Sequence, residues 1–113
     1  MGPIGSNVHD DSVAKRFIVM KMRRRPVQCL VDIGSVVSVV SHSLVLKLEL
    51  RMQETASNTP LLAATGQPLK VLGSVDITFQ LNGLFIPHTF IVIDRLYPTL
   101  ILGADFMRKK VFL

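Results

Sequence analysis

The sequence predicts one mostly-β domain with one or two short helices. Residues 74–81 alternate between apolar and polar side chains, as in a strand with one buried face. Asn82-Gly83 follows directly and is a favoured pair for a two-residue hairpin turn. The chain has 113 residues, of which 49% are hydrophobic. That length and composition support one small core and therefore one domain.

The first strands are expected near the start of the domain. Alternation begins at Arg16 and ends in a predicted turn at residues 23–26. Residues 27–32 form the next expected strand. Its final residues are apolar on both faces, so this strand should lie centrally in a sheet.

A bend and a short helix follow. Gly34-Ser35 predicts the bend, and the apolar, β-branched residues 36–40 predict another strand. Ser41 is a suitable N-cap for a short helix that reaches Leu48. Residues 50–57 are expected to form an irregular strand or loop.

The second half is expected to contain two turns and a long return strand. Residues 60–68 predict a tight turn at 63–67 between short extended arms. The strand that returns from the Asn82-Gly83 turn should cover 84–94 and enter the core at 90–93, where both of its faces are apolar.

The last elements are short. Residues 100–103 predict a buried segment, and residues 104–110 a helix with basic side chains in its final turn, where they complement the helix dipole. Residues 111–113 are expected to form a terminal strand.

The most informative feature is a carboxylate at the end of an apolar strand. Asp32 follows Cys29-Leu30-Val31 and precedes Ile33, Gly34 and Ser35. A buried charge is costly unless it is paired or hydrogen-bonded. Gly34 lets the backbone turn closely around the acid, and Ser35 or backbone N–H groups can then hold its oxygens. The segment is either a chemical site or an Asp that ends a strand and caps the next turn.

Several classes of site are disfavoured. Cys29 is the only cysteine, so an intrachain disulfide is excluded and a reducing compartment is expected. His9, His42 and His88 share no metal-ligand spacing with it, so we expect no metal and no other cofactor. The sequence also lacks the Gly-x-Ser-x-Gly elbow of many serine hydrolases, and Cys29 lies in a predicted core strand.

Charge and hydropathy limit the partners. The net charge of +5 is concentrated in residues 21–25 and 108–110, but these clusters are short and lack interleaved aromatic residues. These features disfavour a dedicated nucleic-acid site. No apolar run approaches the ~18 residues of a membrane span, and the N-terminus lacks a secretion signal. Residues 1–12 are expected to be a disordered leader, in part vector-derived, ahead of a domain at 13–113.

Three segments together resemble the retroviral-type aspartic proteases, and within them the retrotransposon branch. Asp-x-Gly alone is a weak signal, but here it is followed by a Gly-containing turn and an Ile-Leu-Gly-x-Asp-Phe block in the order typical of that family. The resemblance extends from Arg16 to the C-terminus. The segments are PVQCLVDIGS at 26–35, AATGQPL at 63–69 and ILGADFM at 101–107.

The resemblance implies a closed, β-barrel-like retropepsin fold that is one half of a symmetric dimer. It implies that Asp32 is the catalytic acid and that Ile33, Gly34 and Ser35 complete the active-site loop. Gly34 would lie against the substrate backbone, and Ser35 would donate to an outer oxygen of Asp32.

The other two segments acquire roles from the same resemblance. The flap that closes over the substrate would be formed by Ala64, Thr65, Gly66 and Gln67. Structural support beneath the active-site loop would come from Ile101, Leu102 and Gly103.

A dimer is also expected from the chemistry. Hydrolysis of this kind needs two carboxylates near one water, one as base and one carrying a proton. Asp76, Asp94 and Asp105 are not followed by a residue and a Gly at a buried bend. A second copy of the chain must therefore supply the second acid across a two-fold axis. The two acids would share a proton and titrate as a unit.

Two departures from the family pattern leave the activity open. Ile33 stands where the family has Thr or Ser, whose hydroxyl bridges to the partner's loop, and Val36-Val37 stands where many relatives have polar residues. The sequence predicts an aspartic endopeptidase that acts on peptide bonds of a retrotransposon-type polyprotein, in the cytoplasm or within virus-like particles and not secreted. The alternative is a weak or inactive dimerisation or peptide-binding module.

Overall fold

The computed structural model describes residues 15–54, 61–62 and 68–108. The expectations for the leader, for the flap residues Ala64–Gln67 and for the terminal strand 111–113 lie outside these residues. The described elements are, in chain order, β1 (Lys15–Met22), β2 (Arg25–Asp32), β3 (Val39–Ser41), α2 (His42–Lys47), β4 (Met52–Gln53), β5 (Leu61–Leu62), β6 (Pro68–Leu69), β7 (Val71–Leu81), β8 (Leu84–Ile93), β9 (Leu100–Leu102) and α3 (Ala104–Met107).

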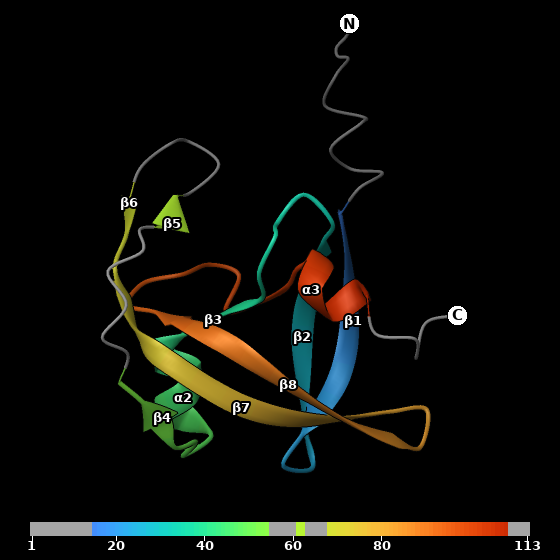
Figure 1. The fold of residues 1–113 in the computed structure, drawn as a ribbon. Coiled ribbons are helices and arrows are strands. Elements are labelled where there is room, and N and C mark those ends of the chain that lie inside the picture. The colour runs from blue at the N-terminus through green and yellow to red at the C-terminus, as the bar shows by residue number, and fades with distance from the viewer. Residues whose placement is uncertain (1–14, 55–60, 63–67, 109–113) are drawn as a thin grey trace, which may run out of the picture.

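Six strands close into a barrel (Figure 1). Their order is β1-β2-β9-β3-β8-β7, and β1 returns to β7 through the pairs Lys21↔Gln80 and Met22↔Phe79. β4 is added to β7, and β5 and β6 form a separate pair. The predicted closed, mostly-β fold with short helices is confirmed.

Local sequence sets both hairpins. β7 and β8 join through Asn82-Gly83, whose φ angles are +51° and +79°, as a two-residue type I′ turn requires. The β1–β2 turn is also two residues long, Arg23-Arg24, and again both φ angles are positive. The predicted turn at 23–26 was too long, because Arg25 already pairs with Met22.

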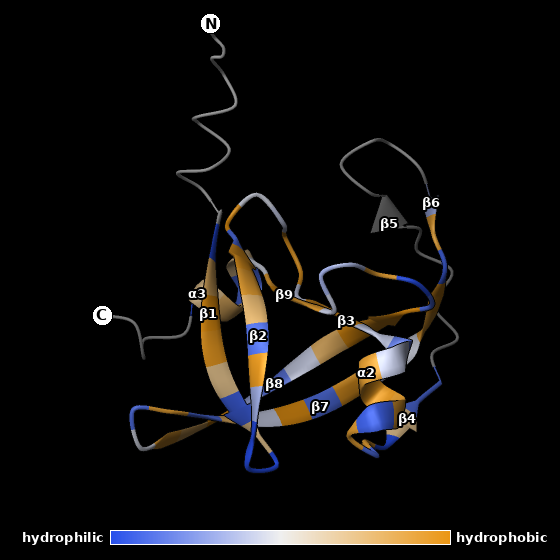
Figure 2. Ribbon diagram, turned by 180° about the vertical axis from the view of Figure 1, so that it is seen from behind, coloured by the Kyte–Doolittle hydropathy of each residue, from blue (hydrophilic) through white to orange (hydrophobic). Residues whose placement is uncertain are grey.

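The core lies inside the barrel and follows the predicted alternation of β7, which Figure 2 shows as alternating hydropathy along the strand. Phe79 points inward, and its ring packs edge-to-face against Phe90 at 5.3 Å and Phe106 at 5.7 Å between ring centroids. All three rings are fully buried. α3 is thereby anchored to the β7–β8 hairpin through Phe106.

The helices are short. Ser41 caps α2 as predicted, since its hydroxyl accepts the Ser43 N–H, and Leu48 is the C-cap. α3 ends at Met107 with Arg108 as its C-cap, so the predicted helix extends beyond the observed one. Among the residues that the structure describes, no helix has the length and apolar character to cross a membrane.

The predicted strand at 36–40 is observed only as β3, which begins at Val39. The preceding residues form a loop because their carbonyl groups have other donors. Val36 O accepts the Asp105 N–H at 3.2 Å, and Val37 O accepts the Ser35 hydroxyl at 2.7 Å. These bonds take the place of a strand ladder.

Candidate active site

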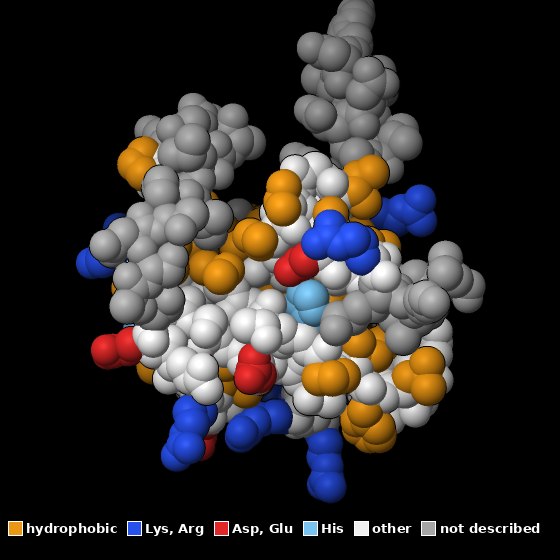
Figure 3. Space-filling model, in the orientation of Figure 1, with side chains coloured by type: hydrophobic (Ala, Val, Ile, Leu, Met, Phe, Trp, Pro, Cys, Tyr) orange, Lys and Arg blue, Asp and Glu red, His pale blue; other side chains and the backbone are white. Residues whose placement is uncertain are grey.

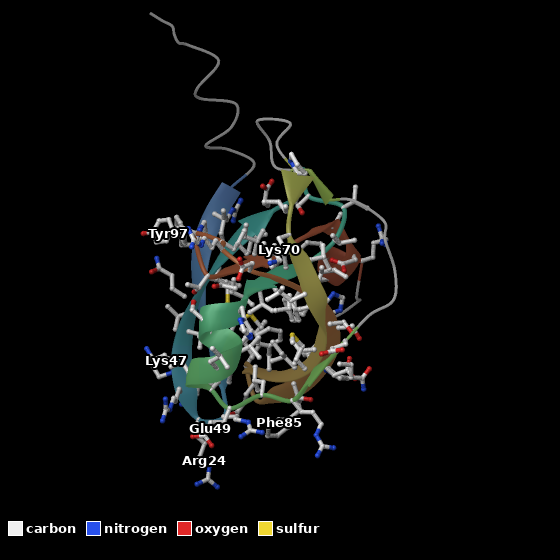
Figure 4. All side chains as sticks on the ribbon, turned by 90° about the vertical axis from the view of Figure 1, so that its left-hand side faces the viewer. Arg24, Lys47, Glu49, Lys70, Phe85 and Tyr97 are labelled. Carbon is white, nitrogen blue, oxygen red and sulfur yellow. The ribbon has the colours of Figure 1, made fainter. Side chains whose placement is uncertain are left out.

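The β2–β3 loop (residues 33–38) follows Asp32 directly and carries the predicted site residues Ile33, Gly34 and Ser35. Figure 1 shows it at the same end of the molecule as β5 and β6, the arms of the predicted flap. Figure 4 places Lys70 and Tyr97 toward that end and Arg24, Glu49 and Phe85 toward the other. The Asp94 N–H donates to Lys70 O at 2.9 Å, which joins the β8–β9 connection to the base of the flap arms.

Asp32 is the last residue of β2 and is half-buried. Its Oδ1 accepts the Gly34 N–H at 3.0 Å, and its backbone oxygen accepts the Ser35 N–H at 3.0 Å. A Cβ added at Gly34 would lie only 3.2 Å from Asp32 Oδ1. The chain therefore turns tightly around the carboxylate, and a residue without a side chain suits position 34.

Ser35 has a different partner from the one expected. Its hydroxyl donates to Val37 O at 2.7 Å rather than to the Asp32 carboxylate. The loop folds back on itself and brings the Val37 carbonyl within reach of Ser35. Ser35 thus stabilises the shape of the loop from within.

The outer surface of the loop is apolar. Ile33 is 59% exposed and Val36 is 71% exposed. Figure 3 shows exposed hydrophobic side chains at the end of the molecule where this loop lies. Exposed apolar groups beside a half-buried carboxylate are typical of a surface that another molecule covers.

The Ile101-Leu102-Gly103 segment lies beside the two strands that carry the loop. β9 runs parallel to β2, with Ile101 opposite Leu30, and antiparallel to β3, with Ile101 opposite Val39. The fold thus places this segment next to the strand that ends at Asp32.

Gly103 makes the closest approach to the loop. A Cβ at this position would lie 2.4 Å from Val37 O and 2.7 Å from Ser35 O. Its φ of −94° is open to any residue, so the requirement for glycine is steric. The next amide, Ala104 N–H, donates to Ser35 O at 2.6 Å.

Sequence reasoning missed a polar cluster beneath the loop, formed by the buried Ser38 and the partly buried His88 and Asp105. In the sequence, Asp105 is identified only as a late acid without a following glycine, and His88 only as a residue without metal-ligand spacing. The structure joins Asp105 to the Ser38 hydroxyl at 2.7 Å and to His88 Nε2 at 3.0 Å. The available signal was the place of Asp105 within the ILGADF block, two residues after Gly103.

The Asp105 carboxyl is acidified by this environment. Burial alone would raise its pKa, but hydrogen bonds from the Ser38 hydroxyl, His88 and the Ser38 N–H outweigh burial. The pKa therefore lies below its ordinary value of 3.8. Asp105 stays ionised at the mildly acidic pH where an enzyme of the expected type would work.

Other candidate chemistries find no support in the described part of the chain. Cys29 is fully buried, and burial raises the pKa of its thiol to about 12, so it does not form the thiolate of a nucleophile. Within the described ranges, no group of three His, Cys, Asp or Glu side chains is arranged to hold a metal ion.

Comparisons with known proteins agree with this geometry. The family model described as gag-polyprotein putative aspartyl protease matches residues 18–109. A search of curated proteins gave no match.

Three solved structures are similar in fold. The EIAV protease complexed with the inhibitor HBY-793 has a TM-score of 0.66 and 22% identity, over 82% of this chain and 85% of that chain. The retroviral protease-like domain of Ddi1 from Leishmania major has a TM-score of 0.66 and 19% identity, over 82% of this chain and 70% of that chain. A retropepsin-like aspartic protease from Rickettsia conorii has a TM-score of 0.60 and 16% identity, over 85% of this chain and 73% of that chain.

Proposed function

Because this chain belongs to the gag-polyprotein aspartyl protease family, we propose that it is an aspartic endopeptidase that works as a homodimer. The observation that carries the proposal is the half-buried Asp32 carboxylate, held by the Gly34 N–H at the end of a barrel strand. The chain also has a retropepsin-like fold. Its fold and its family together support a catalytic role for this carboxylate.

The proposed chemistry uses one Asp32 from each protomer. One carboxylate takes a proton from a water, whose oxygen attacks the carbonyl carbon of the peptide, while the other acid donates its proton to the carbonyl oxygen. The tetrahedral intermediate then collapses with cleavage of the C–N bond. One acid gives its proton to the leaving amine while a hydroxyl of the intermediate returns a proton to the other acid. The products are a carboxylic acid and an amine, and the dyad again holds one proton. Two acids so close cannot both ionise, so the pair enters the cycle with one shared proton.

Two of the other described aspartates, Asp76 and Asp105, support the need for a partner. The Asp105 carboxylate is hydrogen-bonded to Ser38 and His88, and the Asp76 Oδ1 accepts the Thr89 hydroxyl at 2.6 Å. A second copy would bring a second Asp32. Its approach would also cover the exposed apolar side chains of the β2–β3 loop.

The proposed substrate is an extended peptide with apolar side chains around the scissile bond, within a retrotransposon-type polyprotein. Residues Ala64–Gln67 would close over it as a flap and exclude water. We propose that the enzyme needs no metal or organic cofactor, and that it acts in the cytoplasm or within virus-like particles.

The dimer can be tested by sedimentation measured alongside activity. If two chains share one site, cleavage per chain should rise with protein concentration and should reach a plateau when sedimentation shows the dimer. The measurement is the initial rate of hydrolysis of an apolar peptide over a dilution series. A constant rate per chain across conditions where sedimentation shows only monomer would contradict the shared site.

A second candidate function follows from Ile33. Its side chain is 59% exposed on the loop and has no hydroxyl to bond across a dimer axis. The chain could then serve as a dimerisation or peptide-binding module with little or no cleavage.

Replacing Ile33 with Thr should distinguish the two functions. Two symmetry-related hydroxyls would add interchain hydrogen bonds worth about 0.5–1.5 kcal/mol each, so we expect a dimer about tenfold tighter and faster cleavage at low protein concentration. Ile33→Val is the matched control, since Val has nearly the shape of Thr and no hydroxyl. If wild type and Ile33→Thr both dimerise and bind peptide without cleaving it, the module is the better description.

A further inference from the structure

We propose that Asp105 is a positioning residue for the active-site loop, and that Ser38 and His88 complete a carboxylate clamp with it. The clamp (Ser38, His88 and Asp105) joins α3 and β8 to the end of the β2–β3 loop opposite Asp32. The inference rests on the proposed function, because the position of the loop affects cleavage only if Asp32 is catalytic.

The Asp105 carboxylate is fully used as an acceptor. Oδ1 accepts the Ser38 hydroxyl at 2.7 Å and the Phe106 N–H at 2.7 Å. Oδ2 accepts the Ser38 N–H at 3.2 Å and His88 Nε2 at 3.0 Å. Four donors on two oxygens match the acceptor capacity of an ionised carboxylate. An asparagine would have one acceptor oxygen and would turn an NH₂ group toward donors.

Ser38 is the last residue of the β2–β3 loop, so its hydrogen bonds to Asp105 hold that end of the loop in place. It is completely buried, its Oγ also accepts the Gly103 N–H at 2.9 Å, and its backbone oxygen accepts the Ile91 N–H at 3.0 Å. The Asp105 N–H meanwhile donates to Val36 O at 3.2 Å. The loop is thus held by β2 at Asp32 and by the clamp at its other end, and loss of the clamp leaves buried donors without acceptors.

His88 orients the carboxylate from the barrel side. Its side chain is only 9% exposed, and its ring packs edge-to-face against Phe90 at 5.3 Å and Phe106 at 5.0 Å between ring centroids. This packing fixes the ring with Nε2 directed at Asp105. Nε2 donates both in the neutral Nε2–H tautomer and in the protonated ring, so the clamp does not depend on the charge of His88.

The chain contains a matched control for Asp105. Asp76 on β7 lines the same cavity of about 440 Å³ together with Asp105 and His88. Its Oδ1 accepts the Thr89 hydroxyl at 2.6 Å on the exposed side of the hairpin, a bond within the β7–β8 hairpin that does not involve the β2–β3 loop. Asp76→Asn and Asp105→Asn therefore each remove one negative charge from one cavity, and only the second breaks the clamp.

The kinetic test compares these two variants with wild type, per folded dimer and at a temperature where circular dichroism shows each to be folded. For Asp105→Asn we expect kcat to fall by about 10²-fold, the effect of a small misplacement of a reacting group, while KM changes by less than about threefold. Asp76→Asn should retain wild-type kcat and KM. A wild-type kcat in Asp105→Asn would overturn the proposal.

Amide hydrogen exchange gives a readout that does not need cleavage. In Asp105→Asn the amides of Ser38 and Gly103 should exchange about tenfold faster or more, while those of Ile77 and Phe79 in β7 keep their protection. Unchanged exchange at Ser38 would overturn the clamp. Faster exchange at Ser38 and Gly103 with an unchanged kcat would show that the clamp only stabilises the loop, and would overturn the positioning role of Asp105.

Failure of the clamp and failure of the proposed function are distinguishable. A wild type that does not cleave peptide, with faster loop exchange in Asp105→Asn, would refute the protease and leave the clamp standing. Should Asp105→Asn not fold, His88→Phe is measured instead, because it keeps the ring packing and removes one donor. It should show the same changes in smaller degree, and wild-type exchange and kcat in that variant would overturn the proposal.

Discussion

Replacing Asp32 with Asn is expected to abolish peptide cleavage while leaving the fold intact. The Asn side chain can still accept the Gly34 N–H through its amide oxygen, in the place of Asp32 Oδ1. It can neither take a proton from water nor share one with a partner carboxylate. Loss of acid-base catalysis should reduce the rate by about 10²–10⁴-fold, measured as hydrolysis of an apolar peptide at mildly acidic pH.

Mixing wild type with Asp32→Asn tests whether the two catalytic acids come from different chains. In an equal mixture that exchanges subunits at random, only about a quarter of the dimers contain two Asp32 side chains. The rate should fall below that of wild type diluted with buffer to the same concentration of wild-type chains. Equal cleavage by wild type and Asp32→Asn would end the assignment of Asp32 as the catalyst, and no inhibition on mixing would argue against a shared site.

Replacing Gly103 with Ala is expected to have the largest effect on stability. The new methyl group would lie 2.4 Å from Val37 O and 2.7 Å from Ser35 O, and backbone atoms cannot move aside as a flexible side chain can. Overpacking of this kind costs about 1–3 kcal/mol or more. The Tm should therefore fall by roughly 5–20 °C, as measured by thermal unfolding, and cleavage should fall with it because the displaced carbonyls belong to the active-site loop.

Gly83→Ala is the control for this substitution. Gly83 has a φ of +79° and nothing within 4 Å of an added Cβ, so Ala there should cost about 1–2 kcal/mol through backbone strain alone. It should leave kcat unchanged in the folded protein. A Gly103→Ala variant with the Tm and kcat of wild type would show that the loop does not need this close approach.

The parts of the fold that sequence reasoning predicted correctly depend on neighbours along the chain. Asn82-Gly83 favours a type I′ turn by its own backbone preferences, and the alternation beside it directs Phe79 inward. Ser41 caps α2 through a bond to Ser43, only two residues away. Such signals act within a few residues, so they can be read before the fold is known.

The errors share a different origin. Residues 36–38 have the composition of a strand, but their carbonyls bond to groups that only the folded chain brings near, such as the Asp105 N–H on Val36 O. The Ser35 hydroxyl bonds to Val37 O instead of Asp32 because the loop turns back on itself. Distant donors hold that shape: the Ala104 N–H on Ser35 O and the Asp105 N–H on Val36 O. Propensity describes a residue in isolation and is overridden where tertiary partners compete for its backbone.

The sequence by itself determined the β7–β8 hairpin, the helix cap and the place of the Asp32 carboxylate at the end of a strand, because local geometry decides each of them. Only the tertiary structure decided which donors surround Asp105 and why position 103 must be glycine. Ser38 and His88 lie 67 and 17 residues away from Asp105 along the chain. Contacts over such separations depend on how the barrel closes, and no window of the sequence encodes that closure on its own.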